Sequence, residues 1–528
     1  MGKNMKIMKR EFQAFMLKNS TKDYFVKITA EKEEICFEAI DAETEQPTGR
    51  TMVFDNGKQF VENIPIFFSK QIKAVILHIF SYKNHGYKTN YEFCKVIREK
   101  LILQNIPYSF TTTQQTGSAA LLIASNYFAK IGDIVFLITI TGKESTMMNS
   151  ESDFCMITEF EFTKNGYEKL GDRIIDIFET TRNDIFGSYK PVKIIGYATQ
   201  KTALKYLQNL FKFDENLLLI LKDFENESNK FICKMGKWLK RKSLNQFYVS
   251  PTTIKRYAVV GVVGGMPSGV ITGDEDEKLP IIKTAVISKT FQEYLIILMN
   301  ENGPEHVEGV ELNKQYHKVE ITFKIDENNF FSTTSKNIIV PEIRDLPKTL
   351  DKIQKPKIPV IGFWGNSSVI CIKKKGEKYK FMDSWNGIYG NELFLNFNQK
   401  RPILDTNLTM KSKMDTVVFD VLKILSMQID DIKINEAWKF KFTKNDENPI
   451  LIEYDNFEGD KKAASPTFLM AILLRQHLKA VKNEIGEKPE EIGICLFDEF
   501  NVDERKRVEE KLQEACQLLQ IRCNFIKI

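Results

Sequence analysis

The chain has 528 residues, 43% hydrophobic and 27% charged, which is material for about three to four soluble domains. Lys and Arg exceed Asp and Glu by only 75 − 70 = 5, which excludes a broad basic surface for nucleic acid. The eight Cys form no CxxC pair, which argues against a zinc site or a disulfide framework, and no apolar run reaches the roughly 18 residues of a membrane span. We therefore expect a cytoplasmic protein with no metal, no nucleic acid and no membrane as partners.

Between residues 72 and 210, apolar strand-like runs alternate with segments whose apolar residues recur at helical spacing. We expect strands at 73–80, 132–140 and 192–198, and helices at 92–104, 167–181 and 203–211. This alternation is typical of an α/β domain in which helices cover a sheet. We therefore predict an α/β region over residues 1–240.

The pattern changes after this region. Residues 248–339 consist of short β-rich pieces joined by turns such as GMPSG and GDEDE, which predict an all-β module at 241–340. Four prolines between residues 340 and 360 predict an extended linker at 341–358. The α/β character then returns, and we expect another α/β domain at 359–528.

The beginning and the end of the chain resemble each other. Glu99 to Phe110 and Glu514 to Phe525 each span 11 positions, with Ile106 and Ile521 in register. Both copies are predicted to form a strand, a polar turn, an amphipathic helix and a second strand. Common ancestry explains this likeness, and so does the general similarity of strand–helix–strand units.

Taken together, these pieces resemble the 70-kDa heat-shock chaperone family, most clearly at 415–426, 437–455 and 465–526. In that family this order is a helix after the first phosphate loop, a β-hairpin, and a helix–strand–helix leading to the crossover between lobes. The resemblance covers most of the chain beyond about residue 60, but in a broken order. It implies an α/β fold with a shortened actin-like (ribonuclease-H-like) ATPase region, a β-sandwich, and a second, partial first lobe.

The resemblance places the first phosphate loop, which in the family reads G-I-D-L-G-T-T, at Gly365. It implies that a nucleotide there is lined by Gly362, Gly365, Asn366 and Ser367. Phe363 stands where the family has the Asp that organises the magnesium shell. Because an aromatic ring cannot hold a hydrated dication, we expect the magnesium chemistry to be lost.

The other phosphate elements are also reduced. The second loop, D-L-G-G-G-T in the family, keeps only Gly142, with Lys143 as a cation that either meets an anion or is simply solvated. The paired glycines of the adenosine strand become Gly196 and Tyr197, and no lysine stands near Thr406, where the family has its catalytic one. Although the family uses ATP with magnesium, we expect no cofactor and no hydrolysis here.

Two further features bear on partners. The interdomain linker of the family corresponds to 244–248, where most of its leucines are replaced, so we expect weak coupling between domains. In the all-β module, either a peptide groove or core packing explains one set of apolar residues, namely Val262, Val263, Met266, Val270 and Ile271.

These patterns support three hypotheses about function. The first is a degenerate heat-shock-chaperone-like protein that binds unfolded polypeptides or co-chaperones without an ATP cycle. The second is an active ATP-dependent foldase in which residues such as Lys143 take over the missing roles. The third is a structural or interaction scaffold built from the final lobe.

Overall fold

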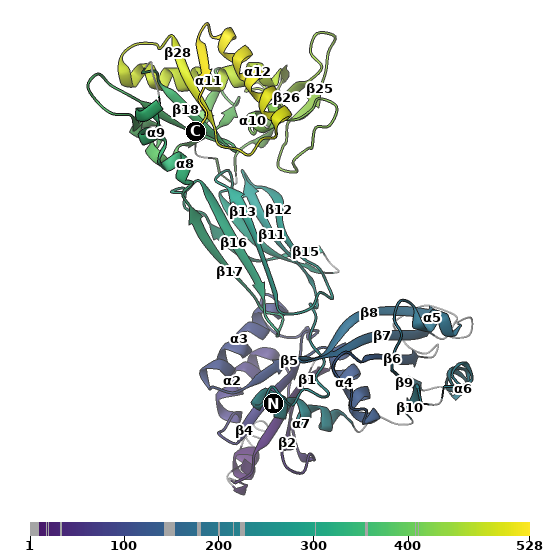
Figure 1. Cartoon of the computed structure of the whole chain (residues 1–528). Helices are drawn as coiled ribbons and strands as arrows, with labels where there is room; N and C mark the ends of the chain where they lie inside the picture. The colour runs from purple at the N-terminus through teal and green to yellow at the C-terminus, as the bar shows by residue number, and fades with distance from the viewer. Residues whose placement is uncertain are drawn as a thin grey trace. The chain divides into compact units, whose positions relative to one another are not determined.

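The computed structural model describes residues 10–16, 18–19, 21–31, 34–141, 154–176, 181–198, 201–214, 216–221, 227–300, 303–353, 357–406, 408–409 and 411–528. The chain is mixed α/β, as predicted, and forms two compact units (Figure 1). Unit 1 comprises residues 1–254 with 276–281 and 325–331, and unit 2 comprises 255–275, 282–324 and 332–528. In the part of the chain that the structure describes, no helix combines the length and apolar character needed to cross a membrane.

The first sheet of unit 1 has the strand order β3-β2-β1-β4-β5. Its central strand, β1, pairs antiparallel with β2 and parallel with β4. Alternate residues of β1 point to opposite faces: Val26 and Ile28 share a core with α2 and α3, whereas Phe25 shares one with α4 and α7. The elements are β1 (Tyr24–Glu31), β2 (Glu34–Asp41), β3 (Pro47–Phe54), α2 (Gly57–Phe67), β4 (Ile72–His78), α3 (Asn90–Leu103), β5 (Tyr108–Phe110), α4 (Thr113–Ser125) and α7 (Glu227–Lys240).

The second sheet of unit 1 repeats this arrangement as β8-β7-β6-β9-β10. Its central strand, β6, again pairs antiparallel with one neighbour and parallel with the other. The elements are β6 (Ile134–Thr141), β7 (Phe154–Thr163), β8 (Gly166–Asp176), α5 (Arg182–Phe186), β9 (Lys193–Ala198), α6 (Lys201–Leu210) and β10 (Leu218–Leu221).

The helix predicted at 167–181 is wrong, because residues 166–176 form strand β8. This strand pairs with β7 along its whole length, from Thr163 opposite Gly166 to Phe154 opposite Asp176. The pair Asn165–Gly166 at the turn is a strong hairpin signal, and Gly166 has a positive φ of +113°. Pairing with a neighbouring strand thus outweighed a weak helical period in the sequence.

The described residues between 256 and 338 form seven strands in two sheets ordered β12-β11-β14-β15 and β13-β16-β17. Side chains such as Val259 and Ile296 from one sheet, and Ile321 from the other, are fully buried. The strands are β11 (Arg256–Val263), β12 (Met266–Gly273), β13 (Ile281–Ser288), β14 (Glu293–Asn300), β15 (Gly303–Glu311), β16 (Lys318–Ile325) and β17 (Phe331–Ile338).

The third sheet, in unit 2, has the order β20-β19-β18-β28-β29, with β21 beside β19. It again repeats the pairing of the first sheet: β18 is antiparallel to β19 and parallel to β28. Helices α10, α11 and α12 contact one another and share a core with one face of this sheet. The elements are β18 (Val360–Trp364), β19 (Ser367–Ile372), β20 (Lys380–Phe381), β21 (Asn391–Glu392), β22 (Phe394–Asn396), β23 (Ile403–Asp405), β24 (Val417–Val418), α10 (Val421–Ser426), β25 (Lys441–Thr443), β26 (Leu451–Asp455), β27 (Lys461–Ala464), α11 (Pro466–Ile485), β28 (Glu491–Leu496), α12 (Val502–Leu518) and β29 (Arg522–Phe525).

The extended linker expected at 341–358 is wrong for most of its length. Residues 341–353 form two short helices, α8 (Pro341–Arg344) and α9 (Leu346–Ile353). Pro341 and Pro347 each lie in the first turn of a helix, where a missing N–H group costs nothing. Leu346 and Leu350 are fully buried against the second face of the third sheet.

The predicted internal repeat takes the form β4–α3–β5 in unit 1 and β28–α12–β29 in unit 2. In both copies a strand leads into a helix and returns to a parallel neighbouring strand. The two copies therefore have the same secondary structure in the same order.

Candidate functional site

The candidate phosphate turn joins β18 to β19. Trp364 and Ser367 form the last pair of the two strands, so Gly365 and Asn366 make a two-residue turn. Gly365 has a φ of +49°, in the left-handed region that glycine adopts without strain. The predicted glycine turn is therefore present in shape, and its chemistry depends on what its backbone N–H groups contact.

The N–H group of Gly365 is already bonded within the protein. It donates to both carboxylate oxygens of Asp498, at 2.9 Å to Oδ1 and 2.8 Å to Oδ2. Burial raises the pKa of Asp498, and the hydrogen bond from Gly365 acts in the opposite direction. A phosphate at this turn needs the same N–H group, so the carboxylate of Asp498 occupies the place of an anion.

Asn366 and Ser367, the other predicted lining residues, point into the protein. Asn366 is 3% exposed, and its Oδ1 accepts a hydrogen bond of 2.8 Å from the backbone N–H of Asp420. Ser367 is 1% exposed. The side chain of Asp420 accepts a hydrogen bond from the indole of Trp438, and its pKa is raised by burial. These buried polar groups stabilise the turn from inside the protein, where a ligand cannot reach them.

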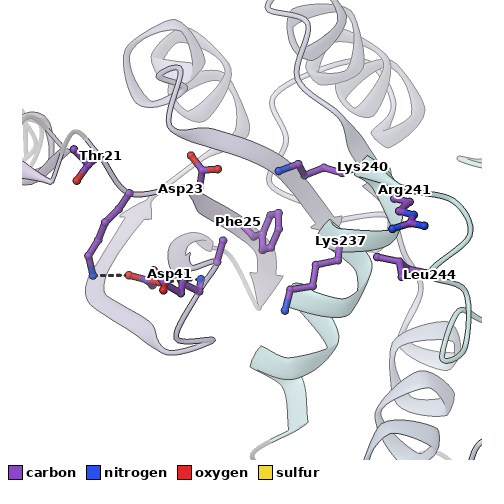
Figure 2. A pocket seen from close by; sticks show the side chains of 11 residues that line it. Thr21, Asp23, Phe25, Asp41, Lys237, Lys240, Arg241 and Leu244 are labelled. Carbon is purple, nitrogen blue, oxygen red and sulfur yellow. Dashed lines mark hydrogen bonds and ion pairs between the residues drawn. The ribbon is translucent and has the colours of Figure 1, made fainter.

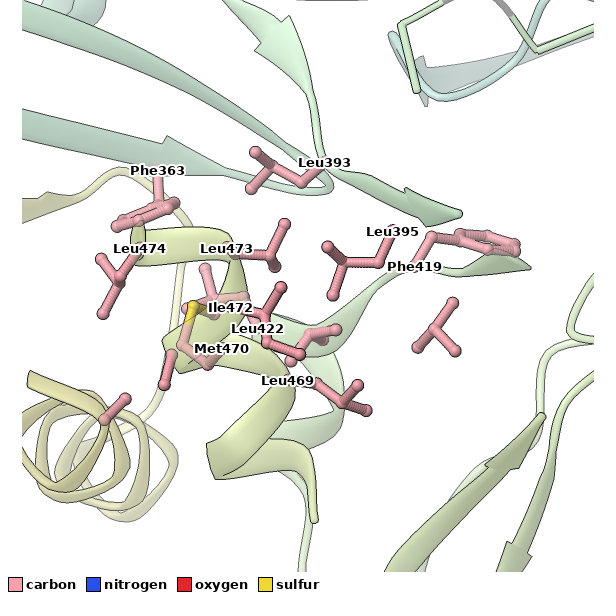
Figure 3. Close-up of a cluster of buried hydrophobic side chains, with 14 of the residues drawn as sticks. Phe363, Leu393, Leu395, Phe419, Leu422, Leu469, Met470, Ile472, Leu473 and Leu474 are labelled. Atoms are coloured by element: carbon pink, nitrogen blue, oxygen red, sulfur yellow. The ribbon is translucent and has the colours of Figure 1, made fainter. Parts of the chain in front are cut away.

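Phe363 lies in the hydrophobic core of unit 2 (Figure 3). Its side chain is fully buried with those of Leu393 on the sheet side and Leu473 and Leu474 on α11. At Gly362, an added Cβ atom would lie 2.6 Å from the ring of Phe497, so this glycine permits close packing. Position 363, where the resemblance would place an acid, thus carries a ring that packs in the core.

Sequence reasoning missed a buried polar pair beside this turn. The hydroxyl of Ser368 lies 2.7 Å from Nε2 of His477, and Nδ1 of His477 lies 2.8 Å from the carbonyl oxygen of Leu473. Because a carbonyl only accepts, Nδ1 carries the proton and Nε2 accepts from Ser368. Burial lowers the pKa of His477 to about 4. Both side chains are fully buried, so this Ser–His pair cannot meet a substrate and serves to fix α11 on the sheet.

The remaining predicted nucleotide residues lie in unit 1. Gly142 and Lys143 lie outside the described residues. Gly196 is on β9, where an added Cβ atom would lie 2.9 Å from Leu207 of α6. Close packing of a helix on the strand accounts for this glycine. Among the described residues, no three His, Cys, Asp or Glu side chains form a set that could hold a metal ion.

The predicted peptide-binding residues of the all-β module differ in exposure. Val262 and Val263 are 1% exposed and Ile271 is 6% exposed, whereas Met266 and Val270 are half-buried. Val263 belongs to the core that also contains Phe363. Packing therefore accounts for the three buried side chains, and only Met266 and Val270 present surface to a peptide.

A buried lysine joins the all-β module to the rest of unit 2. Lys289 is 1% exposed, and its ammonium group donates hydrogen bonds of 2.8 Å to the carbonyl oxygens of Tyr389 and Gly390. Burial lowers its pKa to about 8. The ammonium group of Lys314 also bridges the two parts, because it donates to the carbonyl of Phe291 and to the carboxylate of Glu392.

The segment at 244–250, which includes the 244–248 run compared with the family's linker, is held against the rest of unit 1. Val249 forms a parallel bridge with Tyr167 at the start of β8. The ring of Tyr248 stacks on Trp238 of α7 with 3.8 Å between centroids. At Gly166, an added Cβ atom would lie 2.5 Å from the carbonyl oxygen of Tyr248. Aromatic stacking and backbone pairing thus hold this segment within unit 1, and the weak coupling expected between domains stays a prediction.

Unit 1 also contains an open cavity of about 700 Å³ at the end of the first sheet where β1 begins (Figure 2). Lys237, Lys240 and Arg241, from the end of α7 and just beyond it, face acidic residues that include Asp23 and Asp41. Asp41 forms an ion pair of 2.7 Å with Lys22, and its pKa is lowered to about 2 by this contact and by backbone hydrogen bonds. The cavity carries charges of both signs.

No family model and no curated protein matches this sequence.

Proposed function

We propose that this protein is a degenerate member of the 70-kDa heat-shock chaperone type, which binds unfolded polypeptides or co-chaperones without an ATP cycle. The repeated sheet supports this assignment. Three five-strand paths share one order and one pattern of parallel and antiparallel pairs, with two of them in unit 1 and one in unit 2. We interpret them as actin-like lobes, two making a shortened ATPase-type region and one a partial first lobe.

The proposal that the protein works without a nucleotide is supported by the hydrogen bonds from Gly365 to Asp498. A phosphate loop binds by converging backbone N–H groups, and here the chain supplies its own carboxylate to that group. A phosphate that approached the turn would also meet the negative charge of an ionised Asp498. The one carboxylate described as contacting this turn, that of Asp498, accepts from the N–H group of Gly365, so it occupies the position where a phosphate would bind in phosphoryl transfer.

Other surfaces of the protein can still bind a partner polypeptide. The all-β module presents Met266 and Val270 on its surface, and unit 1 presents a charged cavity around Lys240 and Arg241. Extended polypeptides bind to strand edges and shallow apolar surfaces of this kind without any covalent step. The function proposed is therefore non-catalytic holding of a partner chain.

The experiment measures binding of a fluorescent, permanently unfolded carboxymethylated lactalbumin by the full chain, with and without 5 mM Mg-ATP. We expect micromolar binding that Mg-ATP leaves unchanged within twofold. A partner affinity that shifts tenfold or more with Mg-ATP contradicts the absence of an ATP cycle. No binding of the unfolded probe or of co-chaperones contradicts the proposed function itself.

A second candidate function is that of an interaction scaffold. It is favoured by the buried contacts of Lys289 and Val263, which join the all-β module to the final lobe. If this is the function, Lys289→Met should weaken partner capture together with the stability of unit 2. A variant that loses stability while partner capture stays at the wild-type level at low temperature argues against the scaffold.

A further inference from the structure

An apolar cavity of about 580 Å³ lies in unit 2, away from every predicted site residue. It is bounded by the end of α10, the start of α11 and the side of α12, together with the chain just before β26. A cavity of this size is in the range of sites that hold ligands or anchor side chains.

The floor of this cavity is apolar and its mouth exposes large aliphatic side chains. Leu425 is buried at the floor beside the half-buried Met427 and Ile450. At the mouth, Ile429 is 49% exposed and Leu518 is 59% exposed. Single exposed aliphatic residues are ordinary, but two of them flanking one apolar cavity form a surface that gains free energy when it is covered.

The side chain of Arg507, held by a hydrogen bond, lines the same cavity. Arg507 is half-buried, and its Nε donates a hydrogen bond of 2.9 Å to the carbonyl oxygen of Ser426. Within the described part of the chain, no carboxylate forms an ion pair with Arg507. Its remaining N–H groups form a fork suited to a carboxylate.

The cavity is lined by two cations and two carboxylates, and Arg507 is the cation among them that forms no ion pair within the described residues. Lys511 is bonded to both carboxylate oxygens of Glu514, at 2.7 and 2.8 Å, so this pair is neutral. Glu510 lies exposed on the rim. The first turn of the 20-residue helix α11 also lines the cavity, through Ser465 and Thr467. The positive end of the helix dipole adds to the attraction for an anion.

We propose that this cavity binds an apolar segment of a partner polypeptide and that a carboxylate of that segment pairs with Arg507. This inference rests on the proposed function and assigns the binding surface to the final lobe. The wall from Arg507 to Leu518 spans about 16 Å, or three helical turns, so several side chains of one segment reach it together. The ligand chemistry is therefore a pair or more of aliphatic side chains next to one acidic group.

The test uses a fluorescein-labelled 12-residue peptide with Leu at helical spacing and one Glu, and its counterpart with Gln in place of that Glu. Anisotropy is measured with the full chain and four variants. Arg507→Gln should weaken binding of the Glu peptide about tenfold, the worth of one charge-assisted hydrogen bond. Leu518→Glu should weaken it at least as much, and Glu510→Gln should strengthen it.

Lys506→Gln is the matched control. It removes the same charge from an exposed position of the same helix, outside the cavity, and should leave binding unchanged. Because Leu518 is 59% exposed, Leu518→Glu should keep the wild-type circular dichroism spectrum and melting temperature. Binding of the Gln peptide should be as weak in the wild type as binding of the Glu peptide is to Arg507→Gln.

Equal affinity of the wild type and Arg507→Gln for the Glu peptide overturns the inference, as does the absence of any peptide binding. Binding of dodecanoate at this cavity without peptide binding assigns it to a small amphiphile and overturns it too. In each case, capture of unfolded lactalbumin by the wild type still reports separately on the proposed function. That capture can persist through the all-β module when the cavity plays no part.

Discussion

The first sheet of unit 1 and the third sheet, in unit 2, have the same strand order but carry different residues at the end of the central strand. The last described pair of the central strand and its antiparallel neighbour is Glu31 opposite Glu34 in one sheet and Trp364 opposite Ser367 in the other. One residue earlier on the central strand, Ala30 and Phe363 hold equivalent places. Neither is an acid, so the shared strand order does not place a carboxylate at this position in either sheet.

The two sheets also differ in how their second face is covered. In unit 1 this face shares a core with α4, which follows β5, and with α7, a helix more than 100 residues further along the chain than the sheet itself. In the third sheet it packs on α8 and α9, which directly precede β18. The second face of the third sheet is therefore covered by α8 and α9, which are adjacent to it in the sequence. In unit 1 the distant helix α7 covers part of the corresponding face.

The largest expected effect lies at Phe363, which has the same place in the third sheet that Ala30 has in the first. Phe363→Ala should lower the free energy of unfolding of unit 2 by about 3–5 kcal/mol, because a fully buried ring leaves a cavity. Ala30→Gly, at the equivalent place in unit 1, should cost only about 0.5–1 kcal/mol. Chemical denaturation followed by tryptophan fluorescence separates these outcomes. A loss below about 1 kcal/mol for Phe363→Ala means that the ring does not support the core.

The buried pair of Ser368 on β19 and His477 on α11 gives the stability of unit 2 a pH dependence. The pKa of His477 is lowered from 6.5 to about 4, so the unfolded chain binds more protons than the folded one between these values. The free energy of unfolding should therefore fall by about 2 kcal/mol between pH 7 and pH 5 from this group alone. Its stabilisation is fully present above pH 6.5.

The control for this effect is His477→Gln, which should be less stable at pH 7 but should lose less on acidification. Urea denaturation at pH 7, 6 and 5 measures the difference. If wild type and His477→Gln have the same pH slope, the folded-state pKa of His477 is not depressed and the assignment of its buried neutral form is wrong.

A smaller effect is expected where the segment after α7 is held against the second sheet. Gly166→Ala should speed hydrogen exchange of the N–H groups of Tyr167 and Ser250 about tenfold, because Tyr167 donates to the carbonyl oxygen of Tyr248 and Ser250 donates to that of Tyr167. Gly171→Ala on the same strand places its Cβ atom 3.6 Å from the nearest side-chain atom and should leave exchange unchanged. Equal exchange in the two variants shows that the segment is not held at Gly166.

Some of this could be predicted from the sequence, because the signals are local. The strand–helix–strand repeat and the all-β module follow from residue periodicity and turn residues. Helices α8 and α9 were missed because prolines were interpreted as breakers, although Pro341 and Pro347 lie in first helical turns. The role of Asp498 could not be predicted from any spacing, since it lies 133 positions after the glycine that it contacts. Sequence reasoning identified Phe363 as a position without an acid. The carboxylate that accepts from the turn, that of Asp498, follows a different strand, β28.

The measurement that tests the central claim most directly is a calorimetric titration of Mg-ATP into the full chain. Because the N–H group of Gly365 already donates to the carboxylate of Asp498, we predict no binding heat at millimolar ligand. This should hold for the wild type and for Gly365→Trp alike. Magnesium-dependent binding by the wild type that Gly365→Trp abolishes would contradict the account.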